Sequence, residues 1–167
     1  RADGTGYRQI TDDASRDRGP KWSPDGKRIG FYSDRSGRYE TWAIRPDGSG
    51  RPEQLTKTTG PSRWDSEWSP DGTRLATTDG VKTWIEDLTQ PLGQRTAEAL
   101  PPLAGGHALV PRSWSPDGST IAGDLGFDVT PGSVTLLYSF ARKTYDALPE
   151  GRGTPAWLRD SRRLLIA

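Results

Sequence analysis

The sequence predicts an all-β protein made of four-stranded antiparallel sheets that are arranged radially about an axis, which is the architecture of a β-propeller. Three observations predict it. The pentapeptide WSPDG recurs at Trp22, Trp68 and Trp114, at a constant interval of 46 residues. Short segments rich in β-branched and aromatic residues follow each copy, and glycine and proline separate them. A repeat of about 40 to 50 residues that holds four short strands is typical of a propeller blade.

The first strand of each unit ends at the tryptophan, and three further strands are predicted after it. Alternation of apolar and polar residues, lengths of about four to seven residues and β-forming side chains favour strands over helices. These segments are residues 28–33, 74–78 and 120–123, then 39–44, 82–88 and 133–139, and then 53–56, 97–100 and 145–148.

The SPDG part of the repeat is predicted to be a structural turn between the first and second strands. Proline presets φ at the first central position, aspartate suits the second, and glycine takes the left-handed conformation. The turn residues are Pro24, Asp25, Gly26, Pro70, Asp71, Gly72, Pro116, Asp117 and Gly118. In a degenerate fourth copy, which contains Trp157, Ser161 takes the place of the glycine.

Two further sets of residues recur at the same interval and predict how neighbouring blades pack. Trp22, Trp68 and Trp114 precede the turns, where a large ring can fill the space between blades. The small residues Gly30, Ala76 and Ala122 are also 46 residues apart, and we expect them to let adjacent sheets approach.

The repeats divide the chain, which we interpret as a single domain, into three full blades and two partial ones. The full blades are residues 12–56, 57–100 and 101–148, and the partial ones are residues 1–11 and 149–167. Three full blades are fewer than a closed ring needs, so we expect an incomplete ring or a piece of a larger one. An alternative is a four-bladed ring closed by pairing of residues 7–11 with 157–167, and another is a ring made of two such arcs.

Composition excludes several classes of partner. The chain has 23 basic and 22 acidic residues, a net charge of +1 and interspersed signs, so no nucleic-acid partner is predicted. No apolar run approaches the length of a membrane span, so no membrane insertion is predicted. Cysteine is absent, which removes disulfides and thiolate metal sites.

No catalytic residue, cofactor site or metal site is predicted. Nucleophilic catalysis needs a nucleophile, a base and an orienting group, whereas His107 is the only histidine and stands in a glycine-rich loop. The sequence has no G-x-S-x-G motif. Asp65 and Glu67 lie two residues apart, and we interpret them as a solvated pair of carboxylates rather than as metal ligands.

The loops that enter the innermost strands share one end of a propeller, so their side chains form a candidate rim for a partner. Trp64 lies in such a predicted loop, and we expect it to be half-buried against the next blade. The alternative is a binding anchor, because an aromatic residue beside arginine is a frequent combination at binding surfaces. The candidate partner-binding residues are Arg18, Arg63, Trp64, Asp65, His107 and Arg112.

Residues 22–56, WSPDGKRIGFYSDRSGRYETWAIRPDGSGRPEQLT, resemble the WD40-like β-propeller repeat of the bacterial TolB family. Residues 66–100 and 112–148 are weaker copies, so the resemblance extends over nearly the whole chain. It implies a complete ring of six or seven blades, of which this chain would be a part.

The resemblance implies a non-enzymatic module that binds a protein or peptide partner through rim loops between blades. A periplasmic or other extracytoplasmic location is implied with it, and the cytoplasm stays open as the alternative. The alternative function is the propeller portion of an enzyme, either substrate gating for a prolyl-oligopeptidase-type peptidase or sensing for a bacterial Ser/Thr kinase. Open propeller edges would also allow self-association.

Overall fold

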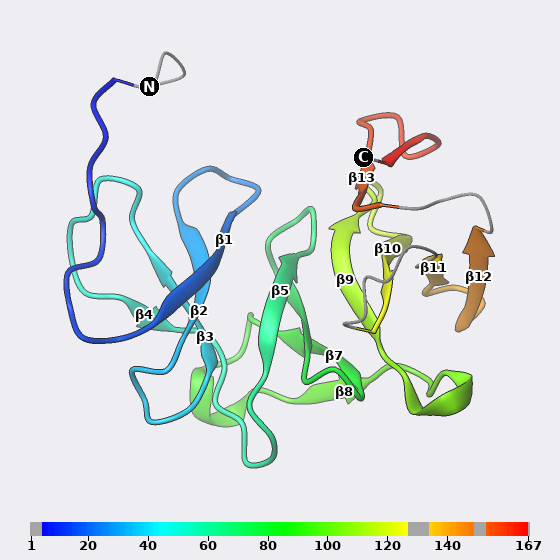
Figure 1. Ribbon diagram of the computed structural model, residues 1–167, viewed down its shortest axis with the longest axis horizontal. Coiled ribbons are helices and arrows are strands. Elements are labelled where there is room, and N and C mark those ends of the chain that lie inside the picture. The colour runs from blue at the N-terminus through cyan, green and yellow to red at the C-terminus, as the bar shows by residue number, and fades with distance from the viewer. Residues whose placement is uncertain (1–4, 127–133, 149–152, 167) are drawn as a thin grey trace.

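Three four-stranded antiparallel sheets follow one another along the chain, and a two-stranded sheet comes after them (Figure 1). The computed structural model describes residues 5–126, 134–148 and 153–166. The first sheet contains β1 (Asp17–Trp22), β2 (Ile29–Ser33), β3 (Glu40–Ile44) and β4 (Glu53–Gln54). The second contains β5 (Trp64–Trp68), β6 (Arg74–Thr78), β7 (Thr83–Asp87) and β8 (Ala97–Ala99). The third contains β9 (Leu109–Trp114), β10 (Thr120–Leu125), β11 (Thr135–Ser139) and β12 (Thr144–Leu148), and β13 (Pro155–Trp157) pairs with β14 (Leu164–Ile166).

The strands within each sheet are neighbours in sequence order, and every pairing is antiparallel. The first strands of successive sheets, β1, β5, β9 and β13, lie next to one another and form the inner edge of an arc (Figure 1). The prediction of an all-β fold with radially arranged four-stranded sheets is therefore confirmed. Only two 3-10 turns, η1 (Leu92–Gln94) and η2 (Ala104–Gly106), interrupt the strands and loops of the described residues. None of the helical turns in these residues has the length and hydrophobicity that a membrane span needs.

Each SPDG segment forms a tight turn between the first two strands of its sheet. Gly26, Gly72 and Gly118 have φ values of 69°, 72° and 74°, a region that only glycine enters without strain. In the second copy, the amide of Gly72 donates to the carbonyl of Ser69 at 2.8 Å, and the Ser69 hydroxyl donates to Asp71 Oδ1 at 2.6 Å. The fourth copy bends similarly at Ser161, whose φ is 55°.

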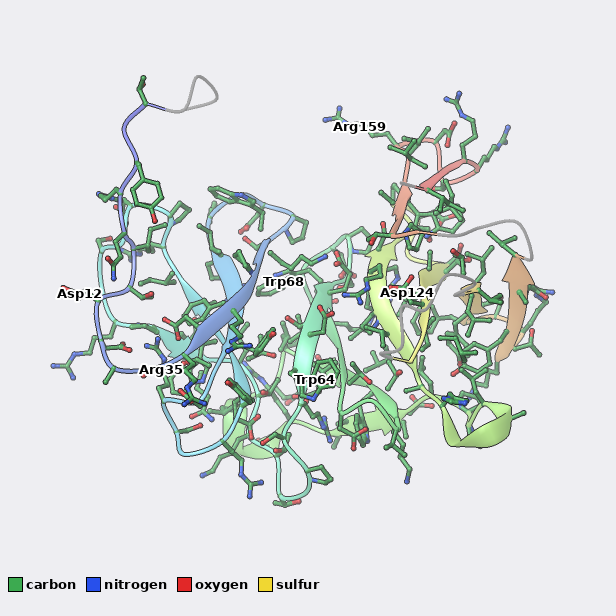
Figure 2. The ribbon with its side chains drawn as sticks, in the orientation of Figure 1. Asp12, Arg35, Trp64, Trp68, Asp124 and Arg159 are labelled. Carbon is green, nitrogen blue, oxygen red and sulfur yellow. The ribbon has the colours of Figure 1, made fainter. Side chains whose placement is uncertain are left out.

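The core lies between neighbouring sheets rather than within one of them. Trp68 packs with Ala43 and Leu55 of the first sheet and with Leu75 of its own sheet, and Figure 2 shows Trp68 beside the first sheet. Trp114 occupies the corresponding place between the second and third sheets. Gly30 permits this approach, because a Cβ atom added there would lie 2.9 Å from Nε1 of Trp68.

Trp22 does not fill a space between blades, and the prediction for this residue is wrong. Its side chain is 61% exposed, whereas those of Trp68 and Trp114 are buried. The physical reason is that a tryptophan at this position packs against the preceding sheet, and the described residues before β1 form no sheet.

Residues 5–16 form no strand, although a partial blade was expected over residues 1–11. Arg8 instead donates to the carbonyl of Pro46 at 3.3 Å, and Ile10 lies beside Gly48. Tyr7 is 95% exposed, and β13 pairs with β14 alone among the described strands. The alternative in which residues 7–11 close a ring with residues 157–167 is therefore not the arrangement found.

Candidate functional site

Ion pairs link the inner strands of all three sheets in a group that we call the axial cluster. Lys21 Nζ of β1 lies 2.9 Å from Glu67 Oε2 of β5 and donates to the carbonyl of Arg112 in β9 at 3.4 Å. Arg112 pairs in turn with Asp65 of β5 through Nη1 and with Asp124 of β10 through Nε, the latter at 2.6 Å. Two carboxylates of β5 therefore pair with cations of both neighbouring sheets at the inner edge, and Asp124 binds Arg112 within the third sheet.

Burial controls the electrostatics of the axial cluster. Desolvation raises the pKa of Asp65 above its ordinary value, and Arg112 and Lys21 oppose that shift. Desolvation likewise raises the pKa of Glu67 against the effect of Lys21. The carboxylates stay close to cations because an unpaired carboxylate in this partly buried position would destabilise the folded state.

Asp65 adopts a left-handed backbone conformation, with φ of 51°. It lies at the irregularity of the β5–β6 pairing, between Trp64 and Ser66. A non-glycine residue in this conformation costs roughly 1 kcal/mol, and such strain persists only where the surroundings compensate it. The ion pair with Arg112 is the compensating contact.

The structure brings together only part of the predicted rim. Asp65 and Arg112 form an ion pair, whereas Arg63 pairs with Glu86 of β7 at 2.6 Å and covers the Trp84 ring at 4.0 Å. Arg18 and His107 are exposed, and no hydrogen bond or ion pair joins them to the axial cluster within the described part of the chain.

Two expectations for this region are wrong. Trp64 does not lie in a loop: it is the first residue of β5, is half-buried and pairs with Thr78 of β6. Asp65 and Glu67 are not a solvated pair, because both carboxylates are largely buried and bind cations of neighbouring sheets. Sequence reasoning missed these partners because they belong to other repeats. The described residues contain no group of three or more His, Asp or Glu side chains that could hold a metal ion.

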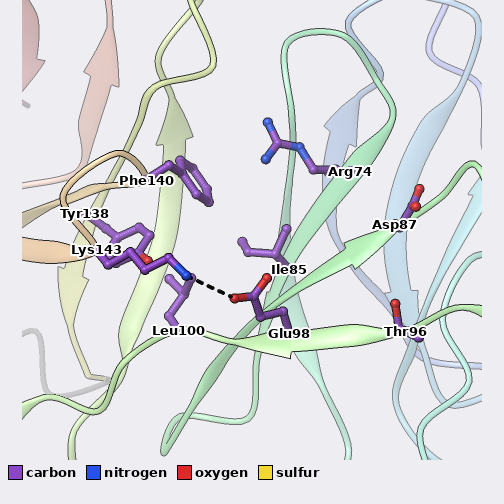
Figure 3. A pocket seen from close by; sticks show the side chains of 9 residues that line it. All are labelled: Arg74, Ile85, Asp87, Thr96, Glu98, Leu100, Tyr138, Phe140 and Lys143. Carbon is purple, nitrogen blue, oxygen red and sulfur yellow. Dashed lines mark ion pairs between the residues drawn. The ribbon is translucent and has the colours of Figure 1, made fainter.

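A groove of about 230 Å³ lies between the second and third sheets (Figure 3). We call it the inter-sheet groove. Its apolar lining comes from β7, β11 and the residues that follow β8 and β11, and consists of Ile85, Leu100, Tyr138 and Phe140. The Phe140 ring stacks on Trp114, with centroids 5.1 Å apart and an interplanar angle of 14°. These four side chains give the groove an apolar floor, which suits an apolar side chain of a ligand.

Charged side chains of both signs surround the inter-sheet groove. Glu98 of β8 and Lys143 of the β11–β12 turn form an ion pair at 3.9 Å across it, and both side chains are mostly exposed (Figure 3). Arg74 also lines the groove, and its guanidinium carbon lies 4.9 and 5.2 Å from the centroids of the Trp114 and Phe140 rings. An apolar floor with polar groups at its edge can bind a peptide segment and orient it. No prediction from the sequence included these residues, and the only available signal was the 46-residue spacing of Arg28 and Arg74.

The radial four-stranded sheets and the packing between them define the class of this protein as a β-propeller. No protein-family model matches the chain. An uncharacterized protein of Agrobacterium fabrum is 31% identical over 124 residues, which cover 68% of this chain and 41% of that protein. The chain thus spans less than half the length of this curated relative.

Solved structures show which propeller the fold resembles. TolB of Acinetobacter baumannii has a TM-score of 0.65 and 24% identity, covering 89% of this chain and 37% of that one. A candidate TolB of Agrobacterium tumefaciens has a TM-score of 0.71 and 20% identity, covering 93% and 55%. An oligogalacturonate lyase of Vibrio parahaemolyticus has a TM-score of 0.59 and 12% identity, covering 83% and 42%. The fold is that of a TolB-like β-propeller, of which this chain contains three four-stranded blades.

Proposed function

We propose that the protein is a non-catalytic β-propeller module that binds a protein or peptide partner on the surfaces between its blades. The inter-sheet groove carries this proposal, because its aromatic floor and its charged edge combine an apolar anchor site with polar groups that set orientation. Aromatic and arginine side chains are the residue types that dominate binding energy at protein interfaces. The TolB-like fold supports the extension of the proposal to an extracytoplasmic location.

The experiment is a selection of displayed random peptides on the immobilised protein, followed by affinity measurement of the selected peptides. Glu98→Lys reverses a charge at the edge of the groove, where the side chain is 81% exposed and not needed for folding. We expect this variant to lose about tenfold in affinity, equivalent to about 1.4 kcal/mol. Glu53→Lys makes the same charge change on β4, outside the groove, and should bind as the parent does. Equal binding by the parent and the Glu98 variant would contradict the proposal.

We propose the predicted rim residues as a second contact region, separate from the inter-sheet groove, of which only Asp65 and Arg112 pair with each other: Arg18, Arg63, Trp64, Asp65, His107 and Arg112. Trp64 is its most informative member because it is half-buried at the start of an inner strand. Replacement of Trp64 by alanine should reduce the free energy of binding to a selected peptide by more than it reduces the free energy of unfolding. A loss of stability of about 3 kcal/mol or more, as for a core tryptophan, would identify Trp64 as scaffold instead.

The alternative is that these blades belong to the propeller of an enzyme. Its support is the fold likeness to an oligogalacturonate lyase and to a dipeptidyl peptidase of Porphyromonas gingivalis, the latter with a TM-score of 0.55 and 11% identity. The coding sequence on either side of these residues distinguishes the two proposals. A hydrolase or kinase domain there would favour the enzyme, whereas an export signal with an α/β domain would favour the TolB-like module.

A further inference from the structure

A second groove, of about 440 Å³, lies against the second sheet and the two connections that border it, and three cations contribute to its lining. It is formed by the β4–β5 connection, which carries Lys57 and Thr59, and by the β7–β8 connection, which carries Gly93 and Arg95. Arg63 and Glu86 complete its polar lining. We call it the cationic groove.

The three cations of this groove exceed its carboxylates in number. Glu86 is the only acidic residue among the described residues that line it, and it is buried and paired with Arg63 at 2.6 Å. Arg95 is held by carbonyl oxygens instead of carboxylates: it donates to Leu55 through Nη1 and to Gln90 through Nε, the latter at 2.8 Å. Carbonyl oxygens orient the guanidinium without neutralising its charge.

Lys57 adds to the unneutralised charge, whereas Arg63 is neutralised by Glu86 and retains only a donor group without an acceptor among the described residues. Lys57 is exposed, and none of the described residues forms an ion pair or hydrogen bond with its ammonium group. The Nε–H of Arg63 is buried and has no acceptor within the described chain. A cationic side chain that lacks a carboxylate partner can bind an anionic ligand favourably.

Two further carboxylates lie near the groove, Glu40 behind it and Asp87 near Arg95, and both already accept hydrogen bonds from threonine side chains. Glu40 is buried and accepts from the hydroxyl of Thr56 at 2.6 Å and from the amide and hydroxyl of Thr58 at 2.8 and 2.7 Å. Arg38 donates to the carbonyls of Thr58 and Gly60 at 3.2 and 2.7 Å, so a further positive charge lies beside the same loop. The region therefore stays net positive when this second layer is included.

The repeat shows that these cations are not a requirement of the fold. Leu103 and Leu109 stand 46 residues after Lys57 and Arg63, and Leu109 is fully buried in the core. In the first sheet, Asp17 stands 46 residues before Arg63 and pairs with Arg35 at 2.9 Å. A blade can thus be built with an apolar or an acidic residue at this position, so the positive charge is specific to this groove.

We propose that the cationic groove binds an acidic peptide segment, whose carboxylates accept hydrogen bonds from Lys57, Arg63 and Arg95. The inference rests on the proposed function, since it names the chemistry of the peptide partner. The volume of the groove is several times that of one carboxylate, and its cations come from two separate connections, which suits an extended chain with successive acidic side chains better than a single small anion.

Calorimetric titration of the whole chain at low salt tests the proposal, with three probes. They are a capped hexapeptide of alternating Asp and Glu, a neutral hexapeptide of Asn and Gln, and inorganic phosphate. Lys57→Gln removes an exposed charge that has no partner, so folding should be unaffected. Lys27→Gln is the matched control, because Lys27 is an exposed lysine in the β1–β2 turn and does not line the groove.

We expect the acidic peptide to bind, and Lys57→Gln to weaken it about fivefold while Lys27→Gln leaves it unchanged. Raising the ionic strength from about 20 mM to about 300 mM should also weaken binding of the acidic peptide to the parent, because salt screens charges in a groove that is open to solvent. Equal affinity in the two variants, no binding of the acidic peptide, or phosphate binding as tight as peptide binding would each overturn the inference. Loss of selected-peptide binding by Glu98→Lys, but not by Lys57→Gln, would leave the proposed function standing and reject only the acidic-peptide site.

Discussion

The guanidinium of Arg74 lies 4.9 Å from the centroid of the Trp114 ring, so a cation of one sheet covers an aromatic ring of the next. The same relationship occurs 46 residues earlier, where Arg28 lies 5.0 Å from the Trp68 ring. The arginine stands two residues after the turn glycine, and the tryptophan ends the inner strand of the following sheet. This repeated contact explains why the tryptophan and the arginine recur with the same period.

Replacement of Arg74 by methionine should lower the free energy of unfolding by about 1 kcal/mol, because it removes the cation above Trp114 and keeps an apolar stem. Urea denaturation followed by tryptophan fluorescence measures the change. Arg51→Met removes an exposed arginine from the loop before β4 and should have no measurable effect. Equal stability of the two variants would show that the contact contributes nothing.

Gly72→Val should destabilise the protein by several kcal/mol. Its φ of 72° lies in a region that β-branched residues strongly disfavour, and its Cβ would lie 3.4 Å from Pro24 of the neighbouring turn. Gly60→Val is the control, since no atom lies within 4 Å of a Cβ there and its φ is not positive. An unchanged melting temperature for Gly72→Val would refute the turn.

Gly30→Ala tests the close approach of the first two sheets. The added methyl group would lie 2.9 Å from Nε1 of Trp68, so the sheets must move apart or the ring must shift. We expect a loss of about 1–3 kcal/mol, as for other overpacked cores. Recovery of stability in the double variant Gly30→Ala/Trp68→Phe would assign the loss to this contact, and no recovery would assign it elsewhere.

Lys21→Met should cost about 3 kcal/mol, because it leaves the carboxylate of Glu67 largely buried without its cation. The second replacement Glu67→Leu should restore most of that stability, because the unpaired charge is then removed as well. Chemical denaturation of the parent, the single variant and the double variant gives the comparison. A single variant as stable as the parent would show that water already solvates Glu67.

The turn aspartates should make stability sensitive to acid. The hydroxyl of Ser69 and the amide of Thr73 lower the pKa of Asp71 to about 2 from its ordinary value of 3.8. The pKa values of Asp25 and Asp117 are lowered in the same way, first by the hydroxyls of Ser23 and Ser115. A carboxyl group with a lowered folded-state pKa stabilises the protein above the ordinary value, and this contribution is lost as the pH falls from about 4 to about 2.

Melting temperatures of the parent and of Asp71→Asn at several pH values test this dependence. The variant should be less stable than the parent at pH of about 5 and should lose less on acidification. Asp65 and Glu67 act in the opposite sense, because their raised pKa values favour the folded state at low pH and that contribution is lost as the pH rises. The effect of Asp65 and Glu67 is the same in the parent and in Asp71→Asn, so it cancels in their difference. Parallel curves of melting temperature against pH for the two proteins would contradict the role of Asp71.

Features of the fold that repeat locally could be predicted from the order of residues. The bend at Gly72 and the strands on either side of it depend on neighbours in the chain, and the steric role of Gly30 depends on the recurring tryptophan of the next repeat. Backbone conformation, strand alternation and turn chemistry act over a few residues, so a recurring word such as WSPDG carries them in every copy.

Charged contacts between sheets could not be predicted, because they depend on the angle and distance at which the sheets pack. The pairing of Asp65 with Arg112, the pairing of Lys21 with Glu67 and the exposure of Trp22 all follow from which sheet stands next to which. The inter-sheet groove arises in the same way, from side chains of successive blades that no local pattern relates. Folding alone therefore decides where charge stays unneutralised and where an apolar floor meets solvent.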